Sequence, residues 1–210
     1  METYPLSLAL FDFVPTFFFL TGAFFLAKTV TICLGVPAAR ILAVGASLVF
    51  LGGFLKAGWK LLYTAQLADI RWMSESQFIF LGIGFSIIFM VVFWMTRKEK
   101  NSIAAAILFF GMAPWKIPFL FLMVVASLGA EGILASLAFR RNLRLAAAGF
   151  IVGVLGILAM GAFASAEQSI AMQWVEETVN ALGQGGFMLG CLLLYRDFKL
   201  KPEQGLHNSR

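Results

Sequence analysis

The sequence predicts an all-α polytopic membrane protein with seven transmembrane helices. Three observations carry this prediction: 60% of the 210 residues are hydrophobic, only 13% are charged, and the mean hydropathy is +0.89. A water-soluble domain has about 25% charged residues, roughly twice this share. Spans of about 20 residues each occupy most of the chain, so no separate soluble domain is expected beside them.

Apolar runs separated by polar breaks predict six of the spans directly. The first run contains Asp12 and has no basic start, so it is predicted to be retained as a helix and not cleaved as a signal peptide. Each run is long enough to cross a hydrocarbon core of about 30 Å. The six predicted spans cover residues 6–28, 40–63, 76–96, 117–139, 144–164 and 172–195.

The remaining span, Ser102 to Ala113, is fourth in chain order and reaches only about 20 Å. The distribution of charge decides whether it crosses. If it crosses, nearly all basic residues fall on one side, and only Arg71 and Lys116 lie in loops on the other. If it does not cross, the basic cluster at 140–144 and the basic tail move outside. We therefore predict seven spans, with the N-terminus outside and the C-terminus in the cytoplasm.

Two stretches of the chain repeat at nearly the same spacing, which predicts an internal duplication. Residues 40–52 match 144–156 at an offset of 104, and residues 75–100 match 176–201 at an offset of 101. The alternative is that glycine and leucine coincide by chance, since both are common in membrane helices. A duplication around one linker helix gives two three-helix units in the same orientation. The predicted units are a first repeat at 1–97, a linker helix and turn at 98–116, a second repeat at 117–201, and a disordered cytoplasmic tail at 202–210.

A proline lies in the first helix of each predicted repeat, at Pro15 and Pro118. In this layout the sequence resembles the seven-helix 3+1+3 transporters of the SWEET and PQ-loop type. The resemblance implies a parallel internal repeat and a role in transport. Thr16 and Phe119 follow the two prolines, so the Pro-Gln pair of the PQ-loop family is absent from both repeats. No substrate site is carried over from the family.

With the predicted orientation, five of the ionisable residues within spans share the outer half of the bilayer. A charge inside a membrane is costly unless it is paired or hydrated, so each one is a candidate functional residue. We expect them to neutralise one another in one interior cluster. They are Asp12 of the first helix, Lys56 and Lys60 of the second, and Glu176 and Glu177 of the seventh.

Helical spacing extends this cluster into polar stripes, because residues three or four apart share a face. Tyr63 continues the stripe of the two lysines, and Gln184 continues the stripe of Glu177 toward the midplane. The predicted ligand-binding residues are Asp12, Thr16, Lys56, Trp59, Lys60, Tyr63, Glu176, Glu177, Asn180 and Gln184.

Simpler roles stay open for the same residues. The lysines can extend to the lipid headgroups, the glutamates can favour a helix start, and the amides can bond between helices. Glu131, in the inner half of the fifth helix, either pairs with a neighbouring helix or carries a proton.

A cavity lined by these groups suits a transporter or ligand-binding protein for a small polar, anionic or zwitterionic solute. A non-catalytic scaffold or partner subunit of a membrane complex is the alternative, and an intramembrane enzyme acting on lipid is a further one. The single histidine, His207, leaves too few ligands for most metal sites or for a histidine-based triad, and no cofactor is predicted. Cys33 and Cys191 are expected to be free thiols.

The predicted partners are the lipid bilayer, a small solute and, as a homo-oligomer or complex subunit, other chains. The net charge of +5 is interpreted as a topology signal, and nothing in the sequence supports nucleic-acid binding. The short loops favour a bacterial cytoplasmic membrane.

Overall fold

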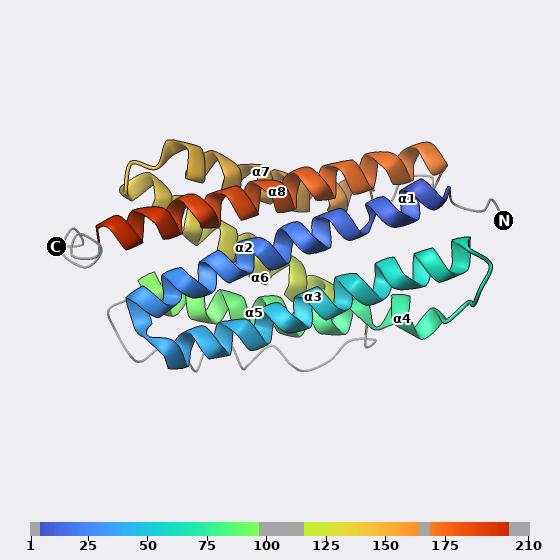
Figure 1. Cartoon of the computed structure of the whole chain (residues 1–210), viewed down its shortest axis with the longest axis horizontal. Coiled ribbons are helices and arrows are strands. Elements are labelled where there is room, and N and C mark those ends of the chain that lie inside the picture. The colour runs from blue at the N-terminus through green and yellow to red at the C-terminus, as the bar shows by residue number, and fades with distance from the viewer. Residues whose placement is uncertain (1–4, 97–115, 164–168, 202–210) are drawn as a thin grey trace.

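A computed structural model describes residues 5–96, 116–163 and 169–201 of the chain. These residues form helices and no strands, which confirms the all-α prediction for this part of the chain (Figure 1). The helices are α1 (Leu6–Phe11), α2 (Phe13–Leu34), α3 (Val36–Thr64), α4 (Arg71–Glu75), α5 (Gln77–Thr96), α6 (Lys116–Arg140), α7 (Arg144–Phe163) and α8 (Ile170–Leu200).

Six helices in the described ranges are long and apolar enough to cross a membrane, and they correspond to the six apolar runs of the sequence. The chain is therefore an integral membrane protein, and its described residues hold six such helices where the sequence predicted seven spans for the whole chain. The predicted fourth span, Ser102 to Ala113, lies outside the described residues, as does the tail 202–210.

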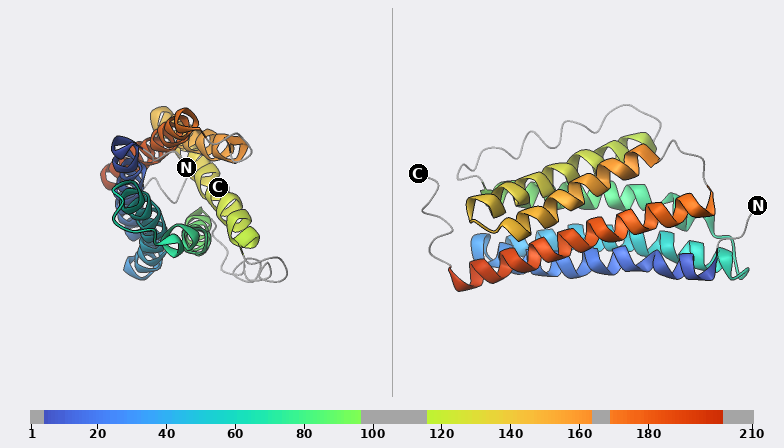
Figure 2. Two further views of the ribbon diagram at one scale, coloured as in Figure 1. Left: turned by 90° about the vertical axis from the view of Figure 1, so that its right-hand side faces the viewer. Right: turned by 90° about the horizontal axis from the view of Figure 1, so that it is seen from above.

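The six long helices close a ring in which each contacts two neighbours (Figure 2). The order around the ring is α1–α2, α3, α5, α6, α7, α8 and back to α1–α2. The helices α1 to α5 form one half of the ring, and α6 to α8 form the other.

Each half holds one very close antiparallel contact between glycines. A Cβ built on Gly45 of α3 would lie 2.8 Å from the carbonyl oxygen of Gly84 of α5, and one on Gly149 of α7 would lie 2.5 Å from that of Gly186 of α8. Small residues allow backbones to approach this closely. Corresponding helix pairs thus pack alike in both halves. The offset of 101 pairs Gly84 with Gly185, whereas Gly186 makes the contact, so the structural register differs by one residue.

The halves meet along two seams, and the helices at each seam run in the same direction. At the first seam, α1–α2 lies along α8: Phe11 packs on Trp174, and Phe25 packs on Tyr195, with ring centroids 5.7 and 5.9 Å apart. Because the numbering rises together along both helices, they are parallel.

At the second seam, α5 lies along α6. The backbone of Phe119 touches Gly82 near the start of both helices, and Gly129 lies against the ring of Phe89 further along. These helices are parallel too, so α5 ends at the opposite end of the bundle from the start of α6 (Figure 1).

The first span is broken by a turn at Asp12, between α1 and α2. Pro15 causes the break, because it has no N–H to donate to the carbonyl of Phe11 and its ring crowds that carbonyl. The turn places the Asp12 carboxyl inside the bundle. Pro118 lies in the first turn of α6, where a missing N–H costs little.

The turn between α2 and α3 is much tighter than predicted, and it consists of Gly35 alone, with φ of +89°. The sequence suggested a loop from Lys28 to Arg40. Both helices instead continue, and the hydroxyls of Thr29 and Thr31 donate to carbonyls one turn earlier, at 3.1 and 2.8 Å. These hydrogen bonds satisfy the threonine hydroxyls within the helix, so the helix continues beyond Lys28, where the predicted span ended.

The main hydrophobic core lies toward the end of the bundle at which α2, α5, α6 and α8 finish. It contains the fully buried side chains Leu26, Val30, Leu42, Val92, Leu134, Phe150 and Leu194. The buried ions at the first seam lie toward the opposite end of the bundle. The interior of the bundle is therefore apolar toward one end and contains buried ions toward the other.

Candidate functional site

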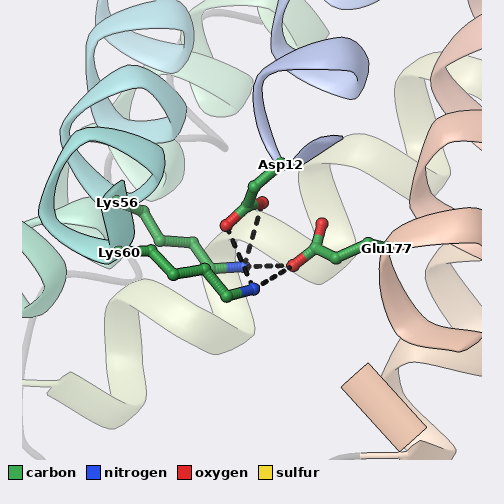
Figure 3. Close-up of polar contacts among 4 residues, drawn as sticks. All are labelled: Asp12, Lys56, Lys60 and Glu177. Atoms are coloured by element: carbon green, nitrogen blue, oxygen red, sulfur yellow. Dashed lines mark hydrogen bonds and ion pairs between the residues drawn. The ribbon is translucent and has the colours of Figure 1, made fainter. Parts of the chain in front are cut away.

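The charge cluster consists of Asp12, Lys56, Lys60 and Glu177 (Figure 3). The ammonium of Lys60 lies 3.1 Å from Glu177 Oε1 and 3.3 Å from Asp12 Oδ2. The ammonium of Lys56 lies 3.3 Å from Glu177 Oε1 and 3.8 Å from Asp12 Oδ1. Each lysine thus contacts both acids, and the predicted buried charge network is confirmed for these four of its five predicted members.

Each member of the charge cluster is positioned by a local feature of its helix. Asp12 occupies the turn created by Pro15, and the two lysines project one turn apart from α3. Glu177 projects from the second turn of α8, which begins at Ile170 with Ser169 as its N-cap. The cluster therefore bridges the first seam between the halves, since the lysines and Asp12 belong to one half and Glu177 to the other.

The charge cluster is electrically balanced and almost fully buried. The side chains of Asp12, Lys60 and Glu177 are 3% exposed or less, whereas that of Lys56 is 30% exposed. Two cations and two anions leave no net charge in the bilayer, which lowers the cost of burying them. Removing one member would leave an uncompensated buried charge. Lys56 is therefore the least buried member of the cluster.

On α8, two buried acceptor oxygens have no hydrogen-bond partner among the described residues. They are Oε2 of Glu177 and Oε1 of Gln184, two turns further along α8. Buried acceptors are normally satisfied by a donor from protein, water or ligand. This face of α8 therefore offers acceptors for a donor such as an ammonium or hydroxyl group.

The other predicted residues of α8 line the same stretch of helix. Glu176 and Asn180 are half-buried, and Glu176 is near enough to Lys56 to act on its ammonium electrostatically. Thr16 is buried on α2, with its Oγ1 against Gly53 of α3, where a Cβ would lie only 2.9 Å away. Thr16 thus supports the close packing of α2 and α3 below the cluster.

The structure places Trp59 and Tyr63 at the end of α3, stacked with ring centroids 5.7 Å apart. The indole N–H of Trp59 donates to Asp69 Oδ1 at 3.0 Å, and Asp69 pairs with Arg71 at 3.0 Å. The described contacts of the indole therefore lead to the loop between α3 and α4 and not to the charge cluster. The hydrogen bond from Trp59, followed by that from Arg71, holds the pKa of Asp69 below its usual value.

Sequence reasoning missed a second ionic contact, at the other end of the bundle. Arg141, after α6, pairs with Asp197 of α8, and its guanidinium carbon lies 3.9 Å from the centre of the Phe198 ring. The available signal was an acid at 197 among basic residues near a helix end. This contact joins α6 to α8 within the second half.

Both cysteines are free thiols, as predicted. Within the described ranges, no three histidine, cysteine, aspartate or glutamate side chains gather in a way that could hold a metal ion. Comparisons of the chain with protein-family models, with curated proteins and with solved structures gave no match.

Proposed function

We propose that the protein is a membrane transporter for a small zwitterionic or anionic solute, and that the charge cluster is both its outer gate and part of its binding site. The observation that carries this proposal is the pairing of Lys56 and Lys60 of one half with Glu177 of the other. Ion pairs that bridge two halves can hold them together and can also be exchanged for pairs with a solute.

The chain direction supports a seven-span, 3+1+3 topology. Since α5 and α6 are parallel, α5 ends and α6 begins at opposite ends of the bundle, as a crossing linker between two repeats requires. In agreement, α1 begins at one end and α8 finishes at the other (Figure 1). The repeats are then 1–97 and 117–201 around a linker at 98–116. This is the layout that the resemblance to SWEET and PQ-loop transporters implies.

A zwitterion fits the cluster better than a simple anion, because it keeps the charge balanced. Its carboxylate would replace Glu177 on the lysines, and its ammonium would pair with the acid that is released. The unpartnered oxygens of Glu177 and Gln184 are acceptors suited to such an ammonium. A neutral exchange of this kind leaves no net charge in the bilayer at any stage.

Opening and closing then follow from the two seams. With the cluster intact, the outer end is closed by ion pairs, and the inner end by the hydrophobic core. A solute that takes over the lysines releases Glu177 and lets the halves separate at the first seam. Movement of one repeat against the other is the general form of alternating access.

The balanced charge of the cluster also supports a second function, that of a structural clasp in a scaffold or complex subunit. In a clasp the ion pairs only hold the halves together, and no ligand replaces them. Lys56 distinguishes the two functions, because the transporter needs its partly exposed side chain for ligand contact, whereas Lys60, with the shorter ion pairs, contributes more to the buried network.

The test uses the Lys56→Met variant, with Lys28→Met as the matched control. Lys28 lies in the second half of α2 beside Phe24, away from the charge cluster at the start of that helix. Purified protein is screened by thermal shift against amino acids, small carboxylates, inorganic phosphate and neutral sugars. Compounds that bind are then tested for counterflow uptake in proteoliposomes. We expect wild type and Lys28→Met to bind and exchange a zwitterion. Lys56→Met should lose some stability, because one acid is left uncompensated, but should remain folded and neither bind nor exchange the zwitterion.

Two outcomes would contradict the transporter. Loss of stability in Lys56→Met with unchanged binding would identify the cluster as a clasp. Failure of the wild-type protein to respond to any compound class would contradict the proposal that it binds a solute.

The topology is tested separately, with a fluorescent protein fused after residue 201 and the fusion expressed in a bacterial inner membrane. Fluorescence is expected because the fusion folds in the cytoplasm, and its absence despite expression would contradict the N-out, C-in orientation.

A further inference from the structure

Glu131 is a third buried acid, separate from the charge cluster and carried by a different helix. Its side chain projects from α6 and is only 5% exposed. Its carboxyl lies directly against the α carbon of Gly153 of α7, where a Cβ would overlap both oxygens. Glycine at this position therefore leaves a niche that the carboxyl group fills.

The niche lies close to the middle of the membrane-spanning part of both helices. Glu131 is about 18 Å from Phe119 and about 14 Å from Arg140 along the axis of α6, at a rise of about 1.5 Å per residue. Gly153 is near the midpoint of α7, which runs from Arg144 to Phe163. The carboxyl is thus several helical turns from either end of the two helices.

No positive charge in the described residues faces this carboxyl group. The neighbouring helix α5 has no ionisable residue, and α7 has only Arg144 at its end. From α8, the buried thiol of Cys191 is close enough to interact with Glu131 electrostatically. On α6 itself, the hydroxyl of Ser127 donates to the carbonyls of Met123 and Val124. Glu131 Oε2 is buried without a hydrogen-bond partner.

An ionised carboxylate in such a place would be an unpaired charge in the bilayer, the most expensive state for a side chain. In the charge cluster, lysines lie beside the buried acids and compensate their charge. Glu131 has no such lysine among the described residues. A bound proton removes the charge of Glu131 without any partner. A metal cation is poorly served here, because such ions need several oxygen ligands.

We propose that Glu131 is a proton-binding site at the middle of the membrane and that it supplies the coupling ion for transport. The site rests on its own geometry, and only the coupling rests on the proposed transport function. The carboxylic acid holds its proton while α6 and α7 are closed over it. When the halves move and water enters, the O–H bond breaks, the proton passes to water, and the carboxylate remains until another proton returns.

The location of Glu131 fits this role. Directly below it, Leu134 and Phe150 belong to the hydrophobic core that closes the inner end. Above it, toward the outer end, the bundle carries the charge cluster. A carboxyl at this boundary becomes accessible from one side or the other as each end opens, which is what a coupled proton requires.

Infrared spectroscopy tests the proton directly. Protein in dodecyl maltoside, a detergent without carbonyl groups, is compared in H₂O and D₂O near neutral pH. We expect wild type to show the C=O stretching band of a protonated carboxyl, shifted to lower frequency in D₂O. The band should be absent from Glu131→Gln and present in the control Glu176→Gln. The proposal would be overturned if the wild-type spectrum lacked this band, or if the band persisted unchanged in Glu131→Gln.

A second measurement does not require the variant to fold. Wild-type protein labelled with ¹³C at the glutamate side-chain carboxyl should show the same band at lower frequency, whereas labelled aspartate should leave it in place. A shift with aspartate alone would assign the proton to Asp12 or another aspartate and contradict the site.

Coupling is tested in proteoliposomes with whichever zwitterion exchanges in the counterflow assay. An inward proton gradient should drive accumulation by wild type but not by Glu131→Gln, which should still perform counterflow. Equal accumulation by both proteins would contradict the coupling. Because the infrared result needs no solute, it can fail or succeed independently of the transport function.

Discussion

Glu177 and Glu131 are two buried glutamates of the same bundle with opposite surroundings. Glu177 accepts from both lysines of α3 at 3.1 and 3.3 Å. Glu131 has no cation beside it in the described part of the chain and lies against the backbone of Gly153. One acid bridges two halves of the ring, and the other lies within the second half, between α6 and α7.

The difference shows that burial alone does not define the role of an acid in a membrane. A paired carboxylate can remain ionised, and its loss exposes the partners' charge to the low-dielectric interior. An unpaired carboxyl group is neutral, and its loss removes no charge at all. The same substitution, glutamate to glutamine, therefore has different consequences at the two positions.

The largest expected effect is at the paired acid. Glu177→Gln leaves two lysines with only Asp12, and breaking a buried pair in this way costs about 3–5 kcal/mol of stability. Glu131→Gln keeps the size and neutrality of the side chain and should change stability by less than about 1 kcal/mol. Thermal unfolding of both variants in the same detergent measures the contrast. Equal losses would contradict it.

A charge-balanced double variant sharpens the same point. Lys60→Met combined with Glu177→Gln leaves Lys56 with Asp12, one cation and one anion. Its loss of stability should be smaller than the sum of the two single losses by about 1–3 kcal/mol, because the residual charge is neutralised. Additive losses would show that the four residues do not act as one network.

An intermediate effect is expected in the niche of the unpaired acid. Gly153→Ala places a methyl group where the Glu131 carboxyl lies, and overpacking of this kind costs about 1–3 kcal/mol. In a Glu131→Ala background the added methyl has room, so the cost should fall. Gly132→Ala is the control, since a Cβ there meets nothing within 4 Å. Unfolding measurements that give Gly153→Ala and Gly132→Ala the same stability would show that the niche is not tight.

The smallest effect concerns an acid in the loop between α3 and α4. Asp69 accepts from Trp59 and pairs with Arg71, and its pKa is lowered by these bonds. A lowered pKa in the folded state means that the carboxylate stabilises the fold above the pKa of the unfolded chain. This contribution is lost as the pH falls through the folded pKa. Following the Trp59 indole N–H by NMR should show a transition below the usual range for aspartate, and Asp69→Asn should abolish it.

Much of the fold could be predicted because membrane helices reveal themselves through local composition. The six apolar runs correspond to six long helices, and the buried ions were recognised because charge inside a span is rare. The helix ends were less predictable. Hydroxyls such as that of Thr29 are satisfied within the helix, so the helix continues through residues that suggest a loop.

The candidate site was harder to predict, since side-chain partners depend on helix rotation and register. A spacing of three or four places Tyr63 with the lysines on one face, yet a helix of 29 residues leaves the protein interior at its end. Trp59 and Tyr63 stack on each other, and Asp69 of the following loop supplies the indole with a partner. The niche at Gly153 depends on a contact between α6 and α7 that no local pattern encodes.

The parallel seams have an electrostatic consequence of their own. Within each half, antiparallel neighbours place the positive end of one helix dipole beside the negative end of the next. At both seams, ends of the same sign lie side by side and repel. The helix dipoles thus favour packing inside each half and oppose packing between the halves. The contacts across the two seams must offset this repulsion, so the seams are the interfaces at which the halves separate most easily.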